Sequence, residues 1–190
     1  MQIAQTCLVR RQRQANDLRE DQCDLRVEAL KASVADRTRV AGSGKLLPTG
    51  QLGDGMKESA QAALTLVKSR ANSLRIPAAM FEGIDLHVHI PAGAIPKHGP
   101  SAGVAKFIAL ASLSTNRPLR HDVAMTGAIS LRVLLLVGGI KQQVLAAQRA
   151  GLHTVLLPAR NLKYLRELPD SARAAMQFVE LDAQGTHRSR

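Results

Sequence analysis

Several residue types are scarce in this sequence of 190 residues, and each scarcity excludes a class of protein. Aromatic residues make up 2% of the chain and Trp is absent, so stacking of bases on aromatic side chains cannot carry binding to single-stranded nucleic acid. The two cysteines, Cys7 and Cys23, are too few for a disulfide framework and match no zinc-ligand spacing. No apolar run approaches the roughly 20 residues that span a bilayer, which excludes a membrane-spanning segment in this sequence.

Positive charge is in excess, but it is not concentrated. The formal net charge is +11, from 26 basic and 15 acidic residues, with one local cluster at Arg10, Arg11 and Arg13. A charge spread in this way confers solubility and a weak attraction to polyanions. Nucleic-acid-binding proteins usually combine a concentrated basic stripe with a recognisable module. We therefore expect nucleic acid to be a weak partner at most, and we expect no membrane partner.

The composition predicts one globular domain with polar ends. Hydrophobic residues make up 45% of the chain and charged residues 22%, which is typical of globular proteins. At this length, folding buries roughly 70% of the surface of the unfolded chain, so no metal or disulfide is required. Residues 1–24 are a polar extension that lacks an apolar signal-peptide core and is too acidic for an organellar transit peptide, so we expect a cytoplasmic protein. We expect the domain over residues 25–181 and a flexible tail over residues 182–190.

Hydrophobic periodicity predicts alternating strands and helices, and hence an α/β or α+β domain with a mixed sheet and packed helices. The turn at residues 42–45 (GSGK) resembles a phosphate-binding loop only superficially, because Leu46 replaces the required Ser or Thr and the upstream Gly is missing. We therefore predict no nucleotide site. The predicted strands are 25–29, 84–90, 123–126, 129–137, 154–157 and 178–181, and the main predicted helices are 56–71 (capped by Asp54 or Gly55), 101–114 and 140–150.

The strongest candidate for a catalytic segment is the loop-to-helix junction at residues 99–103 (GPSAG). A serine in the first turn of a helix lies near unpaired backbone N–H groups, which stabilise an oxyanion while the serine attacks a carbonyl. The small neighbours Ala102 and Gly103 let a substrate backbone approach. The alternative interpretation is that Ser101 is an ordinary N-cap serine, which is a common feature of helices.

Four blocks of sequence together resemble the proteolytic domain of Lon proteases. Residues 85–91 (DLHVHIP) with 96–103 (PKHGPSAG) resemble the strand and nucleophile loop of that family. Residues 49–60 (TGQLGDGMKESA), 122–127 (DVAMTG) and 138–151 (GGIKQQVLAAQRAG) resemble three further family blocks, in the family's order. The resemblance covers about residues 25–181, which is nearly the whole predicted domain.

This resemblance implies an ATP-dependent serine endopeptidase that acts on polypeptides and assembles as a ring, usually a hexamer. In the family, ATP is used by a separate ATPase domain, so the resemblance implies no cofactor in this chain. The family uses a Ser–Lys dyad, in which a neutral Lys amine takes the proton of the nucleophilic Ser. By the resemblance, Ser101 is the nucleophile and Thr126 supports the dyad Lys.

The dyad Lys is the position at which this sequence departs from the family. Gln143 occupies that position, while Lys141 matches a neighbouring position that the family does not use as the base. At about 100° per residue, the two side chains lie roughly 200° apart around a helix. We therefore expect Gln143 to face the core and Lys141 to face solvent. A Gln amide cannot act as the proton acceptor, since its oxygen is only weakly basic.

Further departures support a degenerate active site. Ala128 stands where the family usually has Glu, and His98 stands where it has Asp before the GPS sequence. The segment 131–139 is one residue shorter than its family counterpart, and an ATPase segment is not found in the sequence. We therefore expect a detached and degraded copy that hydrolyses peptide bonds weakly or not at all.

Other interpretations of the same residues remain open. The chain is alternatively a non-catalytic module that assembles with an intact Lon ring, or an active enzyme in which Lys141 or His98 replaces the missing base. Asp85, His87 and His89 share one face of a predicted strand and are candidate metal ligands, although the resemblance assigns them a structural role.

Overall fold

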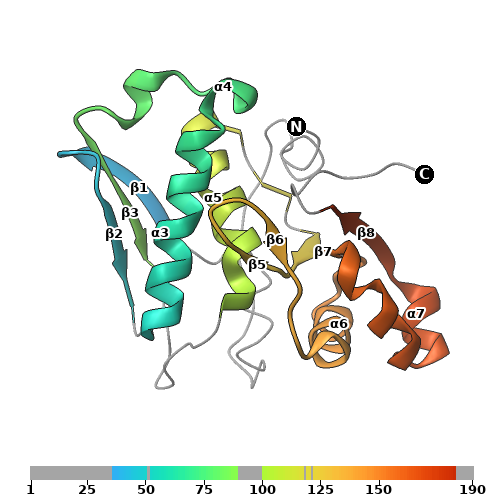
Figure 1. Ribbon diagram of the computed structural model, residues 1–190. Coiled ribbons are helices and arrows are strands. Elements are labelled where there is room, and N and C mark those ends of the chain that lie inside the picture. The colour runs from blue at the N-terminus through green and yellow to red at the C-terminus, as the bar shows by residue number, and fades with distance from the viewer. Residues whose placement is uncertain (1–35, 51, 90–99, 118, 121, 183–190) are drawn as a thin grey trace.

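The computed structural model describes residues 36–50, 52–89, 100–117, 119–120 and 122–182 (Figure 1). The predicted extension, the strand predicted at 25–29, His98 and nearly all of the predicted tail lie outside these ranges. In chain order the elements are β1 (Asp36–Ala41), β2 (Leu46–Thr49), α3 (Asp54–Ser69), α4 (Ala71–Leu74), η1 (Ala78–Phe81), β3 (Ile84–His89), η2 (Pro100–Ala102), α5 (Gly103–Thr115), β4 (Val123–Met125), β5 (Ala128–Ile129), β6 (Leu134–Leu135), α6 (Ile140–Arg149), β7 (Thr154–Pro158), η3 (Ala159–Glu167), α7 (Asp170–Ala175) and β8 (Gln177–Leu181).

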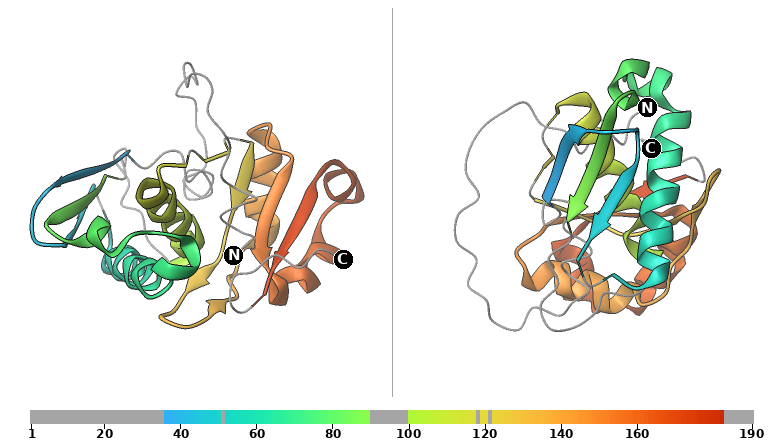
Figure 2. Two further views of the ribbon diagram at one scale, coloured as in Figure 1. Left: turned by 90° about the horizontal axis from the view of Figure 1, so that it is seen from above. Right: turned by 90° about the vertical axis from the view of Figure 1, so that its left-hand side faces the viewer.

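Helices α3 and α5 pack together between two small sheets, which confirms the α/β prediction (Figures 1 and 2). One sheet has the order β1–β3–β2; its central strand β3 is antiparallel to β1 and parallel to β2. The other sheet, β4–β7–β8, is parallel throughout. No helix in the described residues is both long and apolar enough to cross a membrane.

Strand periodicity divides the interior into two cores, one on each face of the parallel sheet. Val123 and Met125 of β4 join the core around α3 and α5, while Ala124 between them joins the core around α6. In β7, Leu156 faces the first core, and its neighbours Val155 and Leu157 face the second. This alternation follows from the two-residue period of a strand, and it places α6 on the face of the sheet opposite α5.

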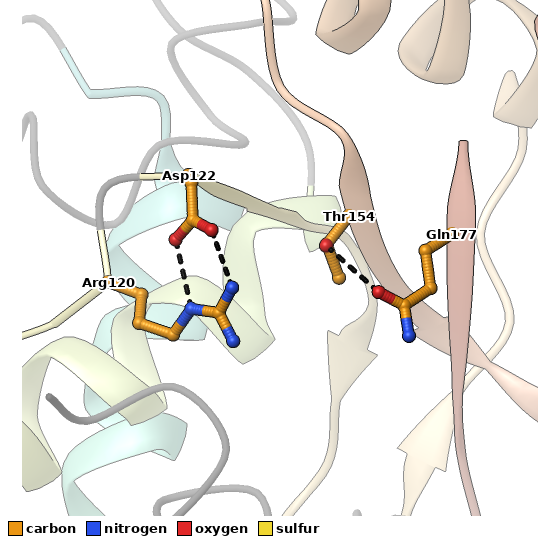
Figure 3. A network of polar contacts seen from close by, with 4 residues as sticks. All are labelled: Arg120, Asp122, Thr154 and Gln177. Carbon is orange, nitrogen blue, oxygen red and sulfur yellow. Dashed lines mark hydrogen bonds and ion pairs between the residues drawn. The ribbon is translucent and has the colours of Figure 1, made fainter. Parts of the chain in front are cut away.

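Two polar contacts lie near the amino-terminal ends of the parallel strands (Figure 3). The Arg120 guanidinium donates two hydrogen bonds to the Asp122 carboxylate, of 2.9 Å from Nε and 2.5 Å from Nη2, just before β4 begins. Thr154 of β7 donates to the Gln177 Oε1 of β8 at 3.5 Å. Since parallel strands point the same way, Thr126 and the other residues after the carboxyl ends of these strands lie at the opposite edge of the sheet.

Helix α5 is buried on nearly every side because its sequence is predominantly apolar. Eleven of its thirteen residues are buried, and it packs against the amphipathic helix α3. Helix α3 begins at Asp54 with Gly53 as its N-cap, so the predicted cap at Asp54 or Gly55 was wrong by one or two residues. The helices predicted at 101–114 and 140–150 are otherwise confirmed within two residues at each end.

The strand predicted over 129–137 was wrong: this segment is a short hairpin made by β5 and β6. Ser130 N–H donates to the Val133 carbonyl at 3.0 Å, and the Ser130 Oγ accepts hydrogen bonds from the N–H groups of Arg132 and Val133. A continuous apolar run suggested one buried strand, but the Ser130 side chain closes a tight turn within it.

The buried side chain of Asn161 fixes the point at which the chain leaves the hairpin. Asn161 is fully buried; its Oδ1 accepts from the Val137 N–H at 3.1 Å and its Nδ2 donates to the Val137 carbonyl at 2.7 Å. Two residues later, Gly139 is the N-cap of α6 and has φ +71°. The side chain of Asn161 therefore holds the backbone just before the start of α6.

We expect Asn161→Ala to lower the free energy of unfolding by about 2–3 kcal/mol, because it leaves two buried backbone groups of Val137 unpaired. Urea denaturation measures the effect. The exposed Asn72 of α4 provides a matched control, since Asn72→Ala should change stability by less than about 0.5 kcal/mol. Equal stability of the two variants would contradict the role given to Asn161.

Candidate active site

Ser101 lies in the short turn η2, immediately before α5, and its side chain is half-buried. The prediction that it occupies the first turn of the α-helix was wrong in this detail, since Ala102 is the N-cap of α5. The Gly127 N–H donates to the Ser101 carbonyl at 2.9 Å, and the Val104 N–H donates to the Gly127 carbonyl at 3.0 Å. These two bonds join the Ser101 turn to the segment that follows β4.

Two glycines make this close approach possible. A Cβ on Gly103 would lie 2.8 Å from the Ile129 backbone nitrogen, which cannot move aside without shifting β5. A Cβ on Gly127 would lie 2.7 Å from Val104 Cγ2, and Gly127 adopts φ +152°, which side-chain-bearing residues rarely do. The GPSAG and DVAMTG blocks therefore require glycine at these positions for packing against each other.

Thr126 sits at the carboxyl end of β4, next to the glycine that holds Ser101. Its N–H donates to the Leu156 carbonyl at 2.9 Å, and it is 1% exposed. Its Oγ1 is buried and has no hydrogen-bond partner within the described part of the chain. A buried hydroxyl without a partner is costly, so its presence marks an environment suited to an additional polar group.

Gln143 and Lys141 face opposite ways on α6, as the helical period predicts. Gln143 is buried, 7% exposed, whereas Lys141 is exposed. The Gln143 Nε2 donates weakly to the Gly138 carbonyl at 3.5 Å, and its Oε1 has no partner among the described residues. Helix α6 packs on Ala124 and Ala128, which bracket Thr126 in sequence. The structure therefore brings α6 against the Thr126 segment with an amide, and not an amine, on its buried side.

Lys106, a buried lysine one turn into α5, was not predicted from the sequence as a site residue. It is 5% exposed, and its Nζ lies 3.1 Å from the Met56 carbonyl oxygen and 3.0 Å from Met56 Sδ. Burial lowers the pKa of Lys106 from 10.5 to about 8. The sequence did hold one indication of a buried lysine, because Lys106 is the single charged residue in an otherwise largely apolar helix.

The predicted face of Asp85, His87 and His89 holds its own sheet together. Asp85 accepts hydrogen bonds from the N–H groups of Ser43 and Lys45 at 2.7 and 2.8 Å, and the Lys45 bond is the main cause that lowers the Asp85 carboxyl pKa. The ring nitrogens His87 Nε2 and His89 Nδ1 each lie 2.8 Å from Thr49 Oγ1. Within the described ranges, no three His, Cys, Asp or Glu side chains are placed to hold a metal ion.

Comparison with known proteins places this arrangement in a family. Residues 31–186 match the profile described as the Lon protease (S16) C-terminal proteolytic domain. The chain is 62% identical over 142 residues to the Lon protease of Paraburkholderia phytofirmans and 58% identical over 148 residues to that of Methylocella silvestris. It is 56% identical over 144 residues to Lon protease 2 of Syntrophobacter fumaroxidans.

These matches cover 74%, 77% and 75% of this chain, respectively, but 18% of each relative. The fold and the matched profile define a proteolytic domain of the Lon type. The chain belongs to the Lon protease family, within its proteolytic domain.

Proposed function

We propose that this chain is a Lon-type serine endopeptidase domain in which Ser101 is the nucleophile and Gln143 occupies the position of the dyad Lys, so that peptide hydrolysis is weak. Two observations together support the proposal. The Ser101 turn is hydrogen-bonded to Gly127, and the buried side of α6 carries the amide of Gln143. Thr126 has the supporting position, because its buried hydroxyl adjoins the glycine that binds the Ser101 carbonyl.

The chemistry explains the expected weakness. Ser101 Oγ would attack the peptide carbonyl carbon, while the proton of its hydroxyl has to leave. An amide at position 143 cannot take that proton, and loss of a general base typically lowers the rate by about 10²–10⁴-fold. Lys141 is exposed on the other side of α6, so it is poorly placed to serve instead.

We expect purified protein to hydrolyse an unstructured fluorogenic peptide slowly, and Ser101→Ala to remove at least about 90% of that rate, since nothing replaces the attacking hydroxyl. Ser171→Ala, at an exposed serine on α7, is the matched control and should leave the rate unchanged. Equal rates for the two variants would refute the assignment of Ser101.

Complete absence of hydrolysis would favour the alternative, a non-catalytic module that assembles with an intact Lon ring. Size-exclusion chromatography with light scattering distinguishes the two cases. We propose that the active form assembles as a homo-oligomeric ring, whereas a module would co-elute with an intact Lon and remain small without it.

A further inference from the structure

Lys106 is the one buried lysine among the lysines that the structure describes. The position is unfavourable for a cation, because burial removes its hydration and no carboxylate within the described residues forms an ion pair with it. An apolar residue of similar size would avoid this penalty. A buried charged group that lowers the stability of the fold, as the Lys106 ammonium does, is a candidate for a role in function.

The position of Lys106 relates it to Ser101. Side chains on a helix tilt toward its N-terminus, so a long side chain at 106 extends back over Ala102, one turn earlier. Ala102 packs with Leu52 and Met56 in a small cluster at the start of α3. Lys106 Nζ contacts the same Met56, and Ala102 is the neighbour of Ser101. The amine therefore lies in the wall between α3 and the Ser101 turn.

The surroundings of Lys106 suit a neutral amine. A neutral primary amine has two N–H groups and one lone pair. The Met56 carbonyl oxygen and Met56 Sδ provide two acceptors, one for each N–H. The lone pair then remains available to accept a proton. The lowered pKa of Lys106, about 8, leaves a substantial neutral fraction near physiological pH.

We propose that Lys106 is the proton acceptor for Ser101, in place of the amine that is missing at position 143. This inference rests on the proposed function, since it requires Ser101 to be the nucleophile. The base would thus come from the same helix that Ser101 precedes and not from α6.

The proposed step conserves atoms and charge. As Ser101 Oγ forms a bond to the substrate carbonyl carbon, its proton passes to the neutral Lys106 amine, which becomes an ammonium group. That ammonium then gives the proton to the leaving nitrogen as the peptide C–N bond breaks. The transfer requires the Lys106 side chain to swing from Met56 toward Ser101 Oγ by rotation about its own torsions.

The experiment compares Lys106→Met, Lys106→Arg and Lys163→Met on the intact chain, with kcat/KM measured on the fluorogenic peptide between pH 6 and 9.5. We expect both Lys106 variants to lose about 10²-fold or more of the Ser101-dependent rate, because Met lacks a base and Arg stays protonated. Lys163→Met, at an exposed lysine of η3, should match the unmodified protein.

Two further readouts separate a base from a structural residue. In the unmodified protein, kcat/KM should rise with pH and level off above about 8, the pKa of Lys106. This limb should be absent from the residual activity of both Lys106 variants. A small primary amine added to Lys106→Ala should restore part of the rate, and the same amine should not restore Ser101→Ala.

Several outcomes would overturn the inference. A Ser101-dependent rate that Lys106→Met leaves unchanged excludes Lys106 as the base, yet leaves Ser101 as the nucleophile. An unmodified protein with no Ser101-dependent rate also overturns the inference, while the inactive-module alternative stands. A rate that survives Ser101→Ala instead refutes the proposed function. Circular dichroism confirms that each variant folds before its rate is interpreted.

Discussion

Gln143→Lys should raise the Ser101-dependent rate of peptide hydrolysis by about 10²-fold or more. The substitution places an amine on the buried side of α6, at the position that we propose corresponds to the dyad Lys. Position 143 is 7% exposed, so burial would keep the pKa of a new amine low enough for it to be neutral in part. Thr126 Oγ1, which is buried and has no hydrogen-bond partner among the described residues, is the acceptor that we expect for that amine. The fluorogenic peptide assay measures the increase.

A control and a double variant sharpen this test. Gln142→Lys adds the same charge at an exposed position one residue away, and should leave the rate unchanged. In the Gln143→Lys protein, removal of Lys106 should cost far less than in the unmodified protein, since a second base is then present. No gain from Gln143→Lys would mean that the amide at position 143 does not limit the rate of hydrolysis.

The sequence predicted those parts of the fold in which local pattern and tertiary contact agree. The helix over 140–150 is bracketed by Gly139 and Gly151, both of which adopt positive φ, so glycine marks its two ends. Its period also predicted that Gln143 is buried and Lys141 exposed. The prediction of a strand over 129–137 was wrong because no neighbouring strand in the described residues pairs with this segment along its length. A two-residue pairing closes around Ser130 instead, and Leu131 remains 60% exposed.

The sequence predicts which motif residues form the candidate site, and their roles stay predictions; the surroundings of those residues could not be predicted. Ser101 and Thr126 belong to sequence blocks that can be recognised from their residues. The hydrogen bond between Gly127 and Ser101 joins those blocks. Lys106 carries no motif. Its burial arises because α3 and both sheets enclose α5 on nearly every side, which shields most of the Lys106 side chain from water. That enclosure depends on packing between segments far apart in sequence.

Lys106→Met should increase the free energy of unfolding by about 3 kcal/mol at pH 7, because each unit of pKa depression corresponds to about 1.4 kcal/mol and the pKa falls from 10.5 to about 8. Met keeps a chain of similar length in contact with Met56 and removes the buried charge. Urea denaturation at pH 7 measures the gain, and Lys163→Met, at an exposed position, should change little.

The gain should shrink as the pH rises, and its direction follows from proton binding. Between the folded pKa of about 8 and the unfolded value of 10.5, the unfolded chain binds more protons at Lys106 than the folded protein does. The stability contributed at this residue therefore increases with pH across that window. By pH 10 the Lys106 amine is neutral in the folded protein, so most of the advantage of Met should have disappeared. A Met variant that is less stable at pH 7, or a difference independent of pH, would show that the ammonium is well solvated or paired. In that case the neutral amine, on which the proton-acceptor role of Lys106 depends, would not form near neutral pH.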